Sequence, residues 1–279
     1  MQVVQTIAEM RALRRAMTGA VGLAPTMGAL HDGHLSLVRA ARERDDHVVV
    51  SIFVNPTQFG PGEDFERYPR DIERDLALLH AEGVEAVFTP PVPEIYQPGA
   101  STFVEVHGVT EVLEGASRPG HFRGVATVVA QLFAIVRPGR AYFGQKDAQQ
   151  LVVVRKLARE LHLDVDVIGL PIVREPDGLA LSSRNAYLSP REREAALVLS
   201  RALRRAGELF AAGESDAGRL RDAMRSLIAA EPLAKVDYVS VADGETLQEL
   251  ERVTGAALAS LAVRIGATRL IDNLTLEPS

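Results

Sequence analysis

Cysteine is absent from the 279 residues of this sequence. Disulfide bonds and thiolate catalysis are therefore excluded, and a zinc site would have only histidine and carboxylate ligands. The run of about 18 apolar residues that a transmembrane helix needs is also absent. The N-terminus lacks the charged and then apolar pattern of a signal peptide. These absences predict a cytoplasmic protein without a membrane partner.

An excess of positive charge is missing as well. The formal net charge is −6, whereas domains that bind nucleic acid usually carry a basic patch. Two short basic clusters, at 11–15 and 201–205, lie in helical patterns, and we interpret them as solvated helix faces. We therefore predict no nucleic-acid partner.

The first part of the chain alternates between strand-like and helical patterns. Apolar strand patterns occur at 21–24, 48–54, 84–88, 141–143 and 163–168, helical patterns at 35–44, 70–81, 126–136 and 148–161, and residues 102–106 alternate in polarity. Strands that alternate with helices of about 10–15 residues predict a mostly parallel sheet. The predicted fold class is α/β, a Rossmann-like doubly wound parallel sheet whose ligand-binding loops lie at the carboxyl ends of the strands.

The pattern changes near residue 172. Pro176-Asp177-Gly178 predicts a turn between two short extended segments. Ser189, Pro190 and Glu192 suit the N-cap, first and third positions of a long helix. A second helix at 217–229 and strands at 236–241, 257–265 and 268–274 follow. We predict two domains, 1–172 and a smaller C-terminal α+β domain over 173–279.

The segment 25–34, PTMGALHDGH, lies between the first strand and the first helix. A glycine-bearing turn from strand to helix places backbone N–H groups against a phosphate. His31 and His34 are three residues apart, so two imidazole donors lie beside the same anion. Metal binding by these two histidines is the weaker alternative, because no neighbouring ligand set is evident.

Two later segments add further groups that bind anions. Phe143 to Asp147 (FGQKD) follows a predicted strand, and Leu181 to Asn185 (LSSRN) supplies two hydroxyls and Arg184. The Lys146 ammonium and the Arg184 guanidinium both suit phosphate oxygens. Neither Gly-x-x-x-x-Gly-Lys-Ser/Thr nor Gly-x-Gly-x-x-Gly occurs, so a nucleotide must be held by a different loop. Three separate signals predict a nucleoside triphosphate and an adenylating enzyme.

The turn His31-Asp32-Gly33-His34 resembles the signature of the nucleotidyltransferase superfamily, which class I aminoacyl-tRNA synthetases share. Five blocks in order resemble more closely the pantoate–β-alanine ligase (pantothenate synthetase) family. They are PTMGALHDGH at 25–34, FVNPTQF at 53–59, GHFRGV at 120–125, FGQKDAQQ at 143–150 and DGLALSSRN at 177–185. The family often has methionine where this chain has Leu181, and leucine fills a similar apolar volume.

The resemblance implies a ligase that uses ATP to join (R)-pantoate to β-alanine through a pantoyl adenylate, releasing AMP and pyrophosphate. The product, pantothenate, is a precursor of coenzyme A. The resemblance also implies a homodimer. The domain over 1–172 would bind the nucleotide, and the domain over 173–279 would close over it as a lid that keeps water from the adenylate.

Individual site residues follow from the same resemblance. His34 would be the main residue that stabilises charge during attack at the α-phosphorus, with His31 and Lys146 as further catalytic residues. Gln58 would contact pantoate and β-alanine, and Gln150 would contact pantoate. Apart from the resemblance, the apolar residues Phe59, Val128 and Val129 suit the methyl groups of pantoate, and the same valines would equally suit a helix core. The ATP-binding set is Met27, Gly28, Ala29, Leu30, His31, Asp32, Gly33, His34, Gly144, Gln145, Lys146, Asp147, Val173, Leu181, Ser182, Ser183 and Arg184.

Magnesium is expected with ATP, held mostly by phosphate oxygens, water and one carboxylate. Asp75 is the candidate ligand, and Asp71 and Glu73 are visible in the same helical segment. His121 and Arg123 belong to a family block but receive no chemical role.

Three alternative functions remain in view. Another nucleotidyltransferase would explain the histidine turn equally well, but not the blocks that contain Gln58 and Gln150. An aminoacyl-tRNA synthetase is disfavoured because neither an anticodon-binding domain nor a basic surface is apparent. A non-catalytic nucleotide sensor would have no need to keep both histidines together with Lys146 and Arg184.

Overall fold

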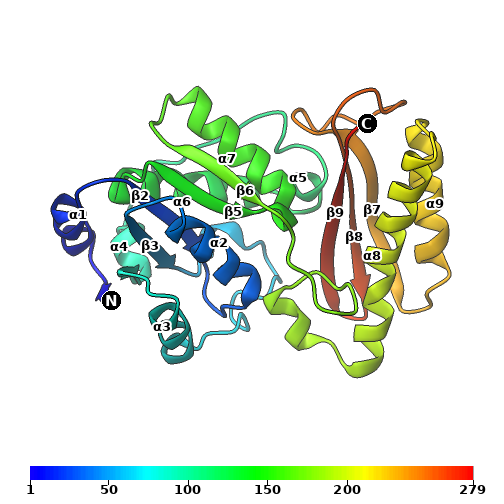
Figure 1. The fold of residues 1–279 in the computed structure, drawn as a ribbon. Helices are drawn as coiled ribbons and strands as arrows, with labels where there is room; N and C mark the ends of the chain where they lie inside the picture. Colours follow the sequence, from blue (N-terminus) through cyan, green and yellow to red (C-terminus); the bar gives the residue numbers. More distant parts are fainter. Residues whose placement is uncertain (279) are drawn as a thin grey trace.

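The computed structural model describes residues 1–278, which form two separate β-sheets surrounded by helices (Figure 1). The first sheet is wholly parallel, in the order β1-β4-β3-β2-β5-β6. Its strands are β1 (Gln2–Val4), β2 (Val21–Thr26), β3 (His47–Ile52), β4 (Ala86–Phe88), β5 (Arg140–Gly144) and β6 (Asp166–Leu170). The second sheet is antiparallel, with β7 (Ala234–Asp243), β8 (Ala257–Ile265) and β9 (Thr268–Leu276) in that order. The predicted α/β class is confirmed.

Helices cover both faces of the parallel sheet. Helices α1 (Ile7–Ala16), α6 (His121–Val136) and α7 (Ala148–Glu160) bury apolar side chains in one core, and α2 (Asp32–Arg42) and α3 (Ile72–Ala81) do so in another. Two shorter helices are α4 (Val92–Ile95) and α5 (Glu114–Ser117). Strands covered on both faces need apolar residues throughout, which explains the unbroken run of valines in β3. None of the helices in residues 1–278 is both long and apolar enough to cross a bilayer.

The strand order determines where a ligand can bind. From β2 the chain adds β3 and β4 on one side, and it then adds β5 and β6 on the other. In doubly wound sheets a crevice opens where the order reverses, beyond the carboxyl ends of the two central strands. Here β2 ends at Thr26, just before the histidine turn, and β5 ends at Gly144, just before Lys146. The topology therefore brings two motifs together that are more than a hundred residues apart.

Helices α8 (Pro190–Ala211) and α9 (Ala217–Ala229) pack on one face of the C-terminal sheet. Ser189 caps α8 in the predicted capping box: its Oγ accepts a bond from the Glu192 amide, and its own amide donates to the Glu192 carboxylate. The C-terminal sheet also contributes to the core of the first part of the chain, because Leu258 of β8 belongs to the same buried cluster as residues of α6 and α7. The domain boundary near residue 172 stays a prediction.

The alternating residues 102–106 do not form a strand. The amide of Val104 donates to the hydroxyl of Thr127 in α6, at 3.0 Å, and Val104 and Val106 pack against the adjoining core. Arg123 lies over the ring of Phe103, 3.9 Å from its centroid. One side of this extended segment therefore rests on a helix, and that arrangement produces the same alternation as a half-buried strand.

Candidate active site

The histidine turn fixes the orientation of both imidazoles. His31 is the N-cap of α2, and its Nδ1 accepts a bond from the Gly33 amide at 3.2 Å. Nδ1 of His34 accepts from the His31 amide at 3.4 Å, and the two ring centroids are 4.1 Å apart. Because each Nδ1 is an acceptor, each neutral ring carries its proton on Nε2. The start of α2 thus presents two adjacent Nε2–H donors.

Glycine at position 33 is required by the His31 ring. A Cβ at Gly33 would lie 2.9 Å from both Nδ1 and Cε1 of His31, which is too close for real carbon atoms. Nearer the start of the turn, Gly28 and Ala29 have left-handed backbones, with φ of +81° and +50°. This part of the chain is therefore held in a conformation that most sequences would avoid.

Asp75 of α3 stabilises that conformation. Its Oδ2 accepts a bond from the Ala29 amide and its Oδ1 from the Leu30 amide, both at 2.8 Å, and the residue is 1% exposed. These contacts occupy both carboxylate oxygens and give Asp75 a structural role in the turn. The sequence suggests Asp75 as a magnesium ligand, but the geometry lends that assignment no support.

Lys146 lies in the turn that follows β5, the 3-10 helix η2 (Gln145–Asp147). Its side chain is 19% exposed, and its ion-pair contact among residues 1–278 is the neighbouring Asp147 at 3.9 Å. Such a long contact is worth little, so the ammonium remains available to another anion. The backbone of the turn is held from the C-terminal sheet, since Nδ2 of Asn273 donates to the carbonyls of Gln145 and Lys146, both at 2.9 Å. Sequence reasoning did not find Asn273.

The third block is attached to the first. Ser182 caps the 3-10 helix η3 (Ser183–Tyr187), and Oγ of Ser183 donates to the carbonyl of Ala29 at 3.3 Å. Arg184 forms a two-pronged ion pair with Asp64, with distances of 2.9 and 2.8 Å. The serines and the guanidinium are thereby held at the mouth of the crevice.

A cavity of about 210 Å³ joins these three segments. Of the predicted site residues, those that line it are Met27, His31, Gly33, His34, Gln58, Gly144, Lys146, Asp147, Gln150, Val173, Leu181, Ser182, Ser183 and Arg184. The others do not line it: Gly28, Ala29 and Leu30 shape the turn, Asp75 holds it, Asp32 lies on the exposed side of α2, and Gln145 lies beside Gly169. The binding role of each residue stays a prediction.

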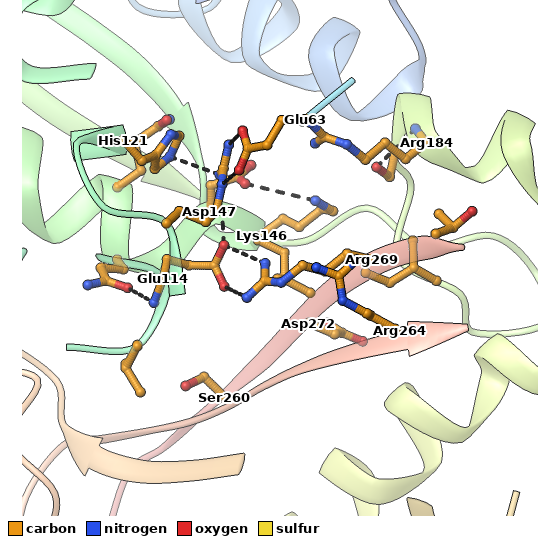
Figure 2. A pocket seen from close by; sticks show the side chains of 18 of the residues that line it. Glu63, Glu114, His121, Lys146, Asp147, Arg184, Ser260, Arg264, Arg269 and Asp272 are labelled. Atoms are coloured by element: carbon orange, nitrogen blue, oxygen red, sulfur yellow. Dashed lines mark hydrogen bonds and ion pairs between the residues drawn. The ribbon is translucent and has the colours of Figure 1, made fainter. Parts of the chain in front are cut away.

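A second cavity, of about 460 Å³, adjoins the first (Figure 2). It lies between the carboxyl edge of the parallel sheet and strands β8 and β9, and its lining includes Ser260, Arg264 and Arg269. Both cavities share Arg118, His121, Lys146, Asp147, Gln150, Ser182 and Arg184. The two spaces therefore meet at the Lys146 turn.

Gln58 ends the 3-10 helix η1 (Pro56–Gln58), and Asn55 sets the direction of its amide. Nδ2 of Asn55 donates to Oε1 of Gln58 at 3.0 Å, which turns the Gln58 NH₂ group toward the cavity side, 3.1 Å from the sulfur of Met27. Asn55 is 1% exposed and also donates to the carbonyl of Gly124 at 3.1 Å. A Cβ at Gly124 would collide with the Thr57 carbonyl, so a glycine lets α6 come this close.

Sequence reasoning missed Asn55. Its place in the block FVNPTQF, three residues before Gln58, was the available signal. An isolated asparagine in a loop usually caps a turn, and Asn55 does that too, because its Oδ1 accepts from the Thr57 amide at 3.3 Å. The second role depends on packing that one sequence does not reveal.

Three histidines around the cavities are held neutral. Burial, and then the charge of Lys146, lower the pKa of His31 to about 4. Burial, and then His31, lower the pKa of His34 to about 3. Burial, and then Arg118, lower the pKa of His121 to about 4. At neutral pH the rings are therefore uncharged hydrogen-bond donors.

These depressed pKa values predict a stability that declines in mild acid. An unfolded histidine titrates near pH 6.5, so between that value and about pH 4 the unfolded chain binds protons that the folded chain does not. Each of the three histidines then reduces the free energy of unfolding by about 1.4 kcal/mol per pH unit. Urea unfolding at about pH 7 and about pH 5.5 checks this expectation.

His47 has the opposite effect on stability, because its hydrogen bond to Glu85 raises its pKa. Protonation of His47 therefore stabilises the folded chain as the pH falls. The measurement is therefore made in a His47→Gln background. Replacing His121 by leucine there is expected to reduce the dependence on pH, and a stability that does not change between the two pH values would contradict the assignment of neutral histidines.

Comparisons with known proteins agree with this geometry. A family model described as pantoate-beta-alanine ligase matches residues 2–275. The chain is 65% identical over 277 residues to a pantothenate synthetase of Roseiflexus sp. (strain RS-1), covering 99% of this chain and 100% of that one. A crystal structure of pantothenate synthetase from Thermus thermophilus has a TM-score of 0.96 and 51% identity, with both chains covered completely.

A crystal structure of pantoate-beta-alanine ligase from Francisella tularensis, complexed with beta-gamma ATP and beta-alanine, is also similar. It has a TM-score of 0.81 and 34% identity and covers 98% of this chain and 97% of that one. The family blocks, the strand order and the cavity that joins them all point the same way. The chain belongs to the pantoate-beta-alanine ligase family of enzymes.

Proposed function

We propose that this chain joins pantoate to β-alanine in two steps, with a pantoyl adenylate held in the 210 Å³ cavity between them. In the first step a carboxylate oxygen of pantoate attacks the α-phosphorus of ATP, and the bond to pyrophosphate breaks. In the second the amine of β-alanine attacks the acyl carbon, AMP leaves, and the amine gives up a proton. The proposal includes the homodimer that the family resemblance implies.

One observation carries the proposal: His34, Lys146 and Arg184 come from three distant segments and line a single cavity. Negative charge grows on the bridging oxygen as pyrophosphate leaves, and fixed donors stabilise that charge in proportion to its growth. The Nε2–H groups of His34 and His31 supply neutral donors, and the ammonium of Lys146 supplies a positive charge. The similar Francisella tularensis ligase, complexed with beta-gamma ATP and beta-alanine, supports ATP and β-alanine as substrates.

Other side chains that line the same cavity suit pantoate. Val128 and Val129 of α6 and the ring of Phe59 form an apolar surface there, suited to a pair of methyl groups. The amides of Gln58 and Gln150 face the same cavity and can bind hydroxyl and carboxylate groups. We infer that Gln58 meets both acid substrates, because Asn55 leaves its NH₂ group as the donor.

We infer that the segment 173–279 acts as a lid over the nucleotide site in 1–172. The contacts of Ser183 with Ala29, and of Arg184 with Asp64, already connect the two parts across the cavity mouth. A mixed anhydride such as the adenylate reacts with water, so keeping these contacts closed while it is bound would protect it. The Ser182–Arg184 segment would also deliver its phosphate-binding groups only in the closed state.

Magnesium is expected to accompany ATP in this site. Within residues 1–278, no group of three or more histidine, aspartate or glutamate side chains gathers as a metal site. Both oxygens of Asp75 are occupied by backbone amides. The donor set of the protein therefore does not form a metal cage, and an ion brought by ATP would keep phosphate and water ligands.

Exchange of labelled pyrophosphate into ATP, without β-alanine, tests the proposed function. The chain is expected to catalyse this exchange with pantoate and not with acetate, β-hydroxybutyrate or nicotinate-type acids. Exchange with a different acid would favour another nucleotidyltransferase, and ATP binding with no exchange under any acid would favour a nucleotide sensor. Either result would contradict the proposal.

A further inference from the structure

The backbone of Gln58 is held by two side chains that the sequence left without a role. Nδ1 of His121 donates to the Gln58 carbonyl at 2.8 Å, and Nη2 of Arg118 donates to the same oxygen at 3.5 Å. Nη1 of Arg118 donates to Nε2 of His121 at 3.1 Å, which leaves the His121 proton on Nδ1, where the Gln58 carbonyl needs it. His121 and Arg118 therefore fix the position of the Gln58 backbone at the end of η1.

Arg118 is itself held by carboxylates on both sides. Its Nε and Nη2 pair with the two oxygens of Glu63 at 2.7 and 2.8 Å, and its Nη1 lies 3.8 Å from Glu114. A guanidinium in such a fork loses most of its rotational freedom. The position of Arg118 thus depends on Glu63 from the 59–70 loop and on Glu114 from α5.

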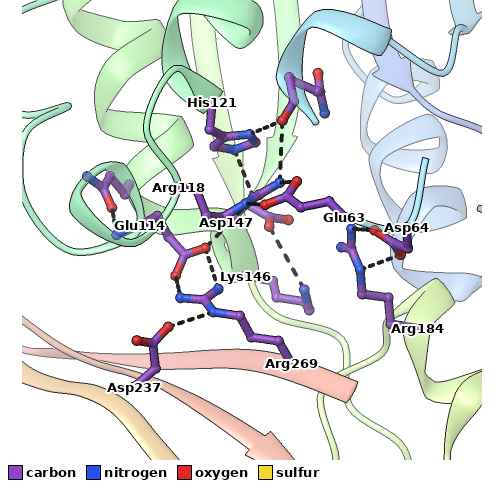
Figure 3. A network of polar contacts seen from close by, with 12 residues as sticks. Glu63, Asp64, Glu114, Arg118, His121, Lys146, Asp147, Arg184, Asp237 and Arg269 are labelled. Atoms are coloured by element: carbon purple, nitrogen blue, oxygen red, sulfur yellow. Dashed lines mark hydrogen bonds and ion pairs between the residues drawn. The ribbon is translucent and has the colours of Figure 1, made fainter. Parts of the chain in front are cut away.

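Glu114 connects this set to the C-terminal sheet. Its buried carboxylate receives both Nη atoms of Arg269 from β9, at 2.8 and 2.7 Å, and Nε of Arg269 donates to Asp237 of β7 at 2.7 Å. Burial alone would lower the pKa of Arg269, but its bonds to Glu114 and Asp237 raise it. Figure 3 shows the continuous path from Asp237 through Arg269, Glu114 and Arg118 to His121.

From these contacts we infer that Arg269, Glu114, Arg118 and His121 form a positioning network for Gln58. Docking of the C-terminal sheet through Arg269 and Glu114 holds Arg118, and Arg118 with His121 holds the Gln58 backbone in the place where its amide meets pantoate. The inference rests on the proposed role of Gln58. None of these four residues needs to touch a reacting atom, and each acts through the position of another.

If these ion pairs only attached one sheet to the other, they would not be expected to lead to Gln58, the residue proposed to bind pantoate. Here the last contact is the main-chain carbonyl of Gln58, and Arg118 and His121 line both cavities. A network of this kind should therefore affect how well pantoate binds, in addition to how stable the protein is.

The test variant is Arg269→Met with Glu114→Gln, which removes both charges of this buried pair together. Asp237 loses its partner Arg269, but its side chain is 30% exposed, and Arg118 keeps its bonds to Glu63. In the pantoate-dependent exchange assay, KM for pantoate is expected to rise roughly tenfold, as for one misplaced hydrogen bond, with a smaller change in kcat. The matched control is Arg140→Met with Asp45→Asn. That pair has a similar buried carboxylate at 2.9 Å, but it lies at the amino end of β5, away from the cavities.

A Gln58→Ala background separates positioning from general weakening. There the network variant is expected to change KM for pantoate by less than about twofold, because residues that act through one another are not additive. His121→Leu, which removes the bond to the Gln58 carbonyl together with the bond from Arg118, is expected to reproduce the rise in KM in the otherwise unchanged protein. Thermal unfolding of every variant confirms that each is folded.

Two results would overturn the positioning network: a KM in the network variant equal to that of the control, or an increase just as large in the Gln58→Ala background. Loss of the proposed function gives a different result. It would show as absence of pantoate-dependent exchange in the unmodified protein, before any variant is compared.

Discussion

Replacing Lys146 by alanine is expected to slow pantoate-dependent ATP–pyrophosphate exchange by roughly 10²–10³-fold, the usual cost of removing one donor to a developing charge. Among residues 1–278 the ammonium has one ion-pair contact, a long one with Asp147 at 3.9 Å, so its charge is available to the phosphates. The fold should survive, because Asn273 holds the turn through backbone carbonyls that alanine retains. Steady-state exchange rates, together with a melting curve, measure both effects.

Lys156 provides the control for that experiment. It lies on α7, the helix that directly follows the Lys146 turn, and its ammonium forms an ion pair with Glu160. Lys156→Ala is expected to exchange at the unmodified rate. Unmodified rates in the Lys146→Ala variant as well would remove Lys146 from the proposed chemistry.

The second large effect is expected from His34. Replacing it by alanine removes one Nε2–H donor, which we propose lies beside the α-phosphate, and should lower kcat for exchange by about 10²–10³-fold. KM for ATP should change much less, since the donor acts mainly on charge that appears in the transition state. The bond that alanine loses to the His31 amide is long, at 3.4 Å, so we expect little loss of stability.

His31→Asn separates catalysis from helix capping. Asparagine is a preferred N-cap, so the start of α2 should remain intact, while the Nε2–H donor is lost. We expect slower exchange with an unchanged melting temperature. His107→Ala is the matched histidine control, since that side chain is 79% exposed in the 102–112 loop. Full activity in His31→Asn would show that His31 serves only as a cap.

Much of the fold could be predicted because its signals are local. Ser189, Pro190 and Glu192 define the start of α8 through contacts within four residues. The strands of the parallel sheet are apolar runs, and their alternation with helices indicates the topology without knowledge of any long-range contact. Segment 102–106 shows the limit of such signals, because contact with α6 gives it the alternation of a half-buried strand. The short strand β1 was not predicted, and neither were the bounds of helix α1.

The candidate site could be predicted in part for the same reason. Residues in the family blocks, such as His34 and Lys146, are recognisable as types at fixed spacings, and strand order then brings them together. Asn273 and Arg269 were not recognisable, because each acts on a residue more than a hundred positions away. Such contacts depend on how the C-terminal sheet packs on the first part of the chain, which composition and periodicity do not predict.

Asp75 illustrates a different limit. A carboxylate near a predicted phosphate site suggests a metal ligand, and its place on α3 was compatible with that role. In the structure the carboxylate accepts bonds from the amides of Ala29 and Leu30, and its role as a magnesium ligand stays a prediction. From sequence alone, an acid that binds backbone N–H groups and an acid that binds a cation have the same appearance.

A crystal structure of the chain with pantoate and an ATP analogue whose α,β-bridging oxygen is methylene tests the account most directly. We expect phosphate oxygens within about 3.5 Å of Nε2 of His34, Nζ of Lys146 and the guanidinium of Arg184 at the same time. A triphosphate bound outside the 210 Å³ cavity, or one that those three groups do not share, would contradict it.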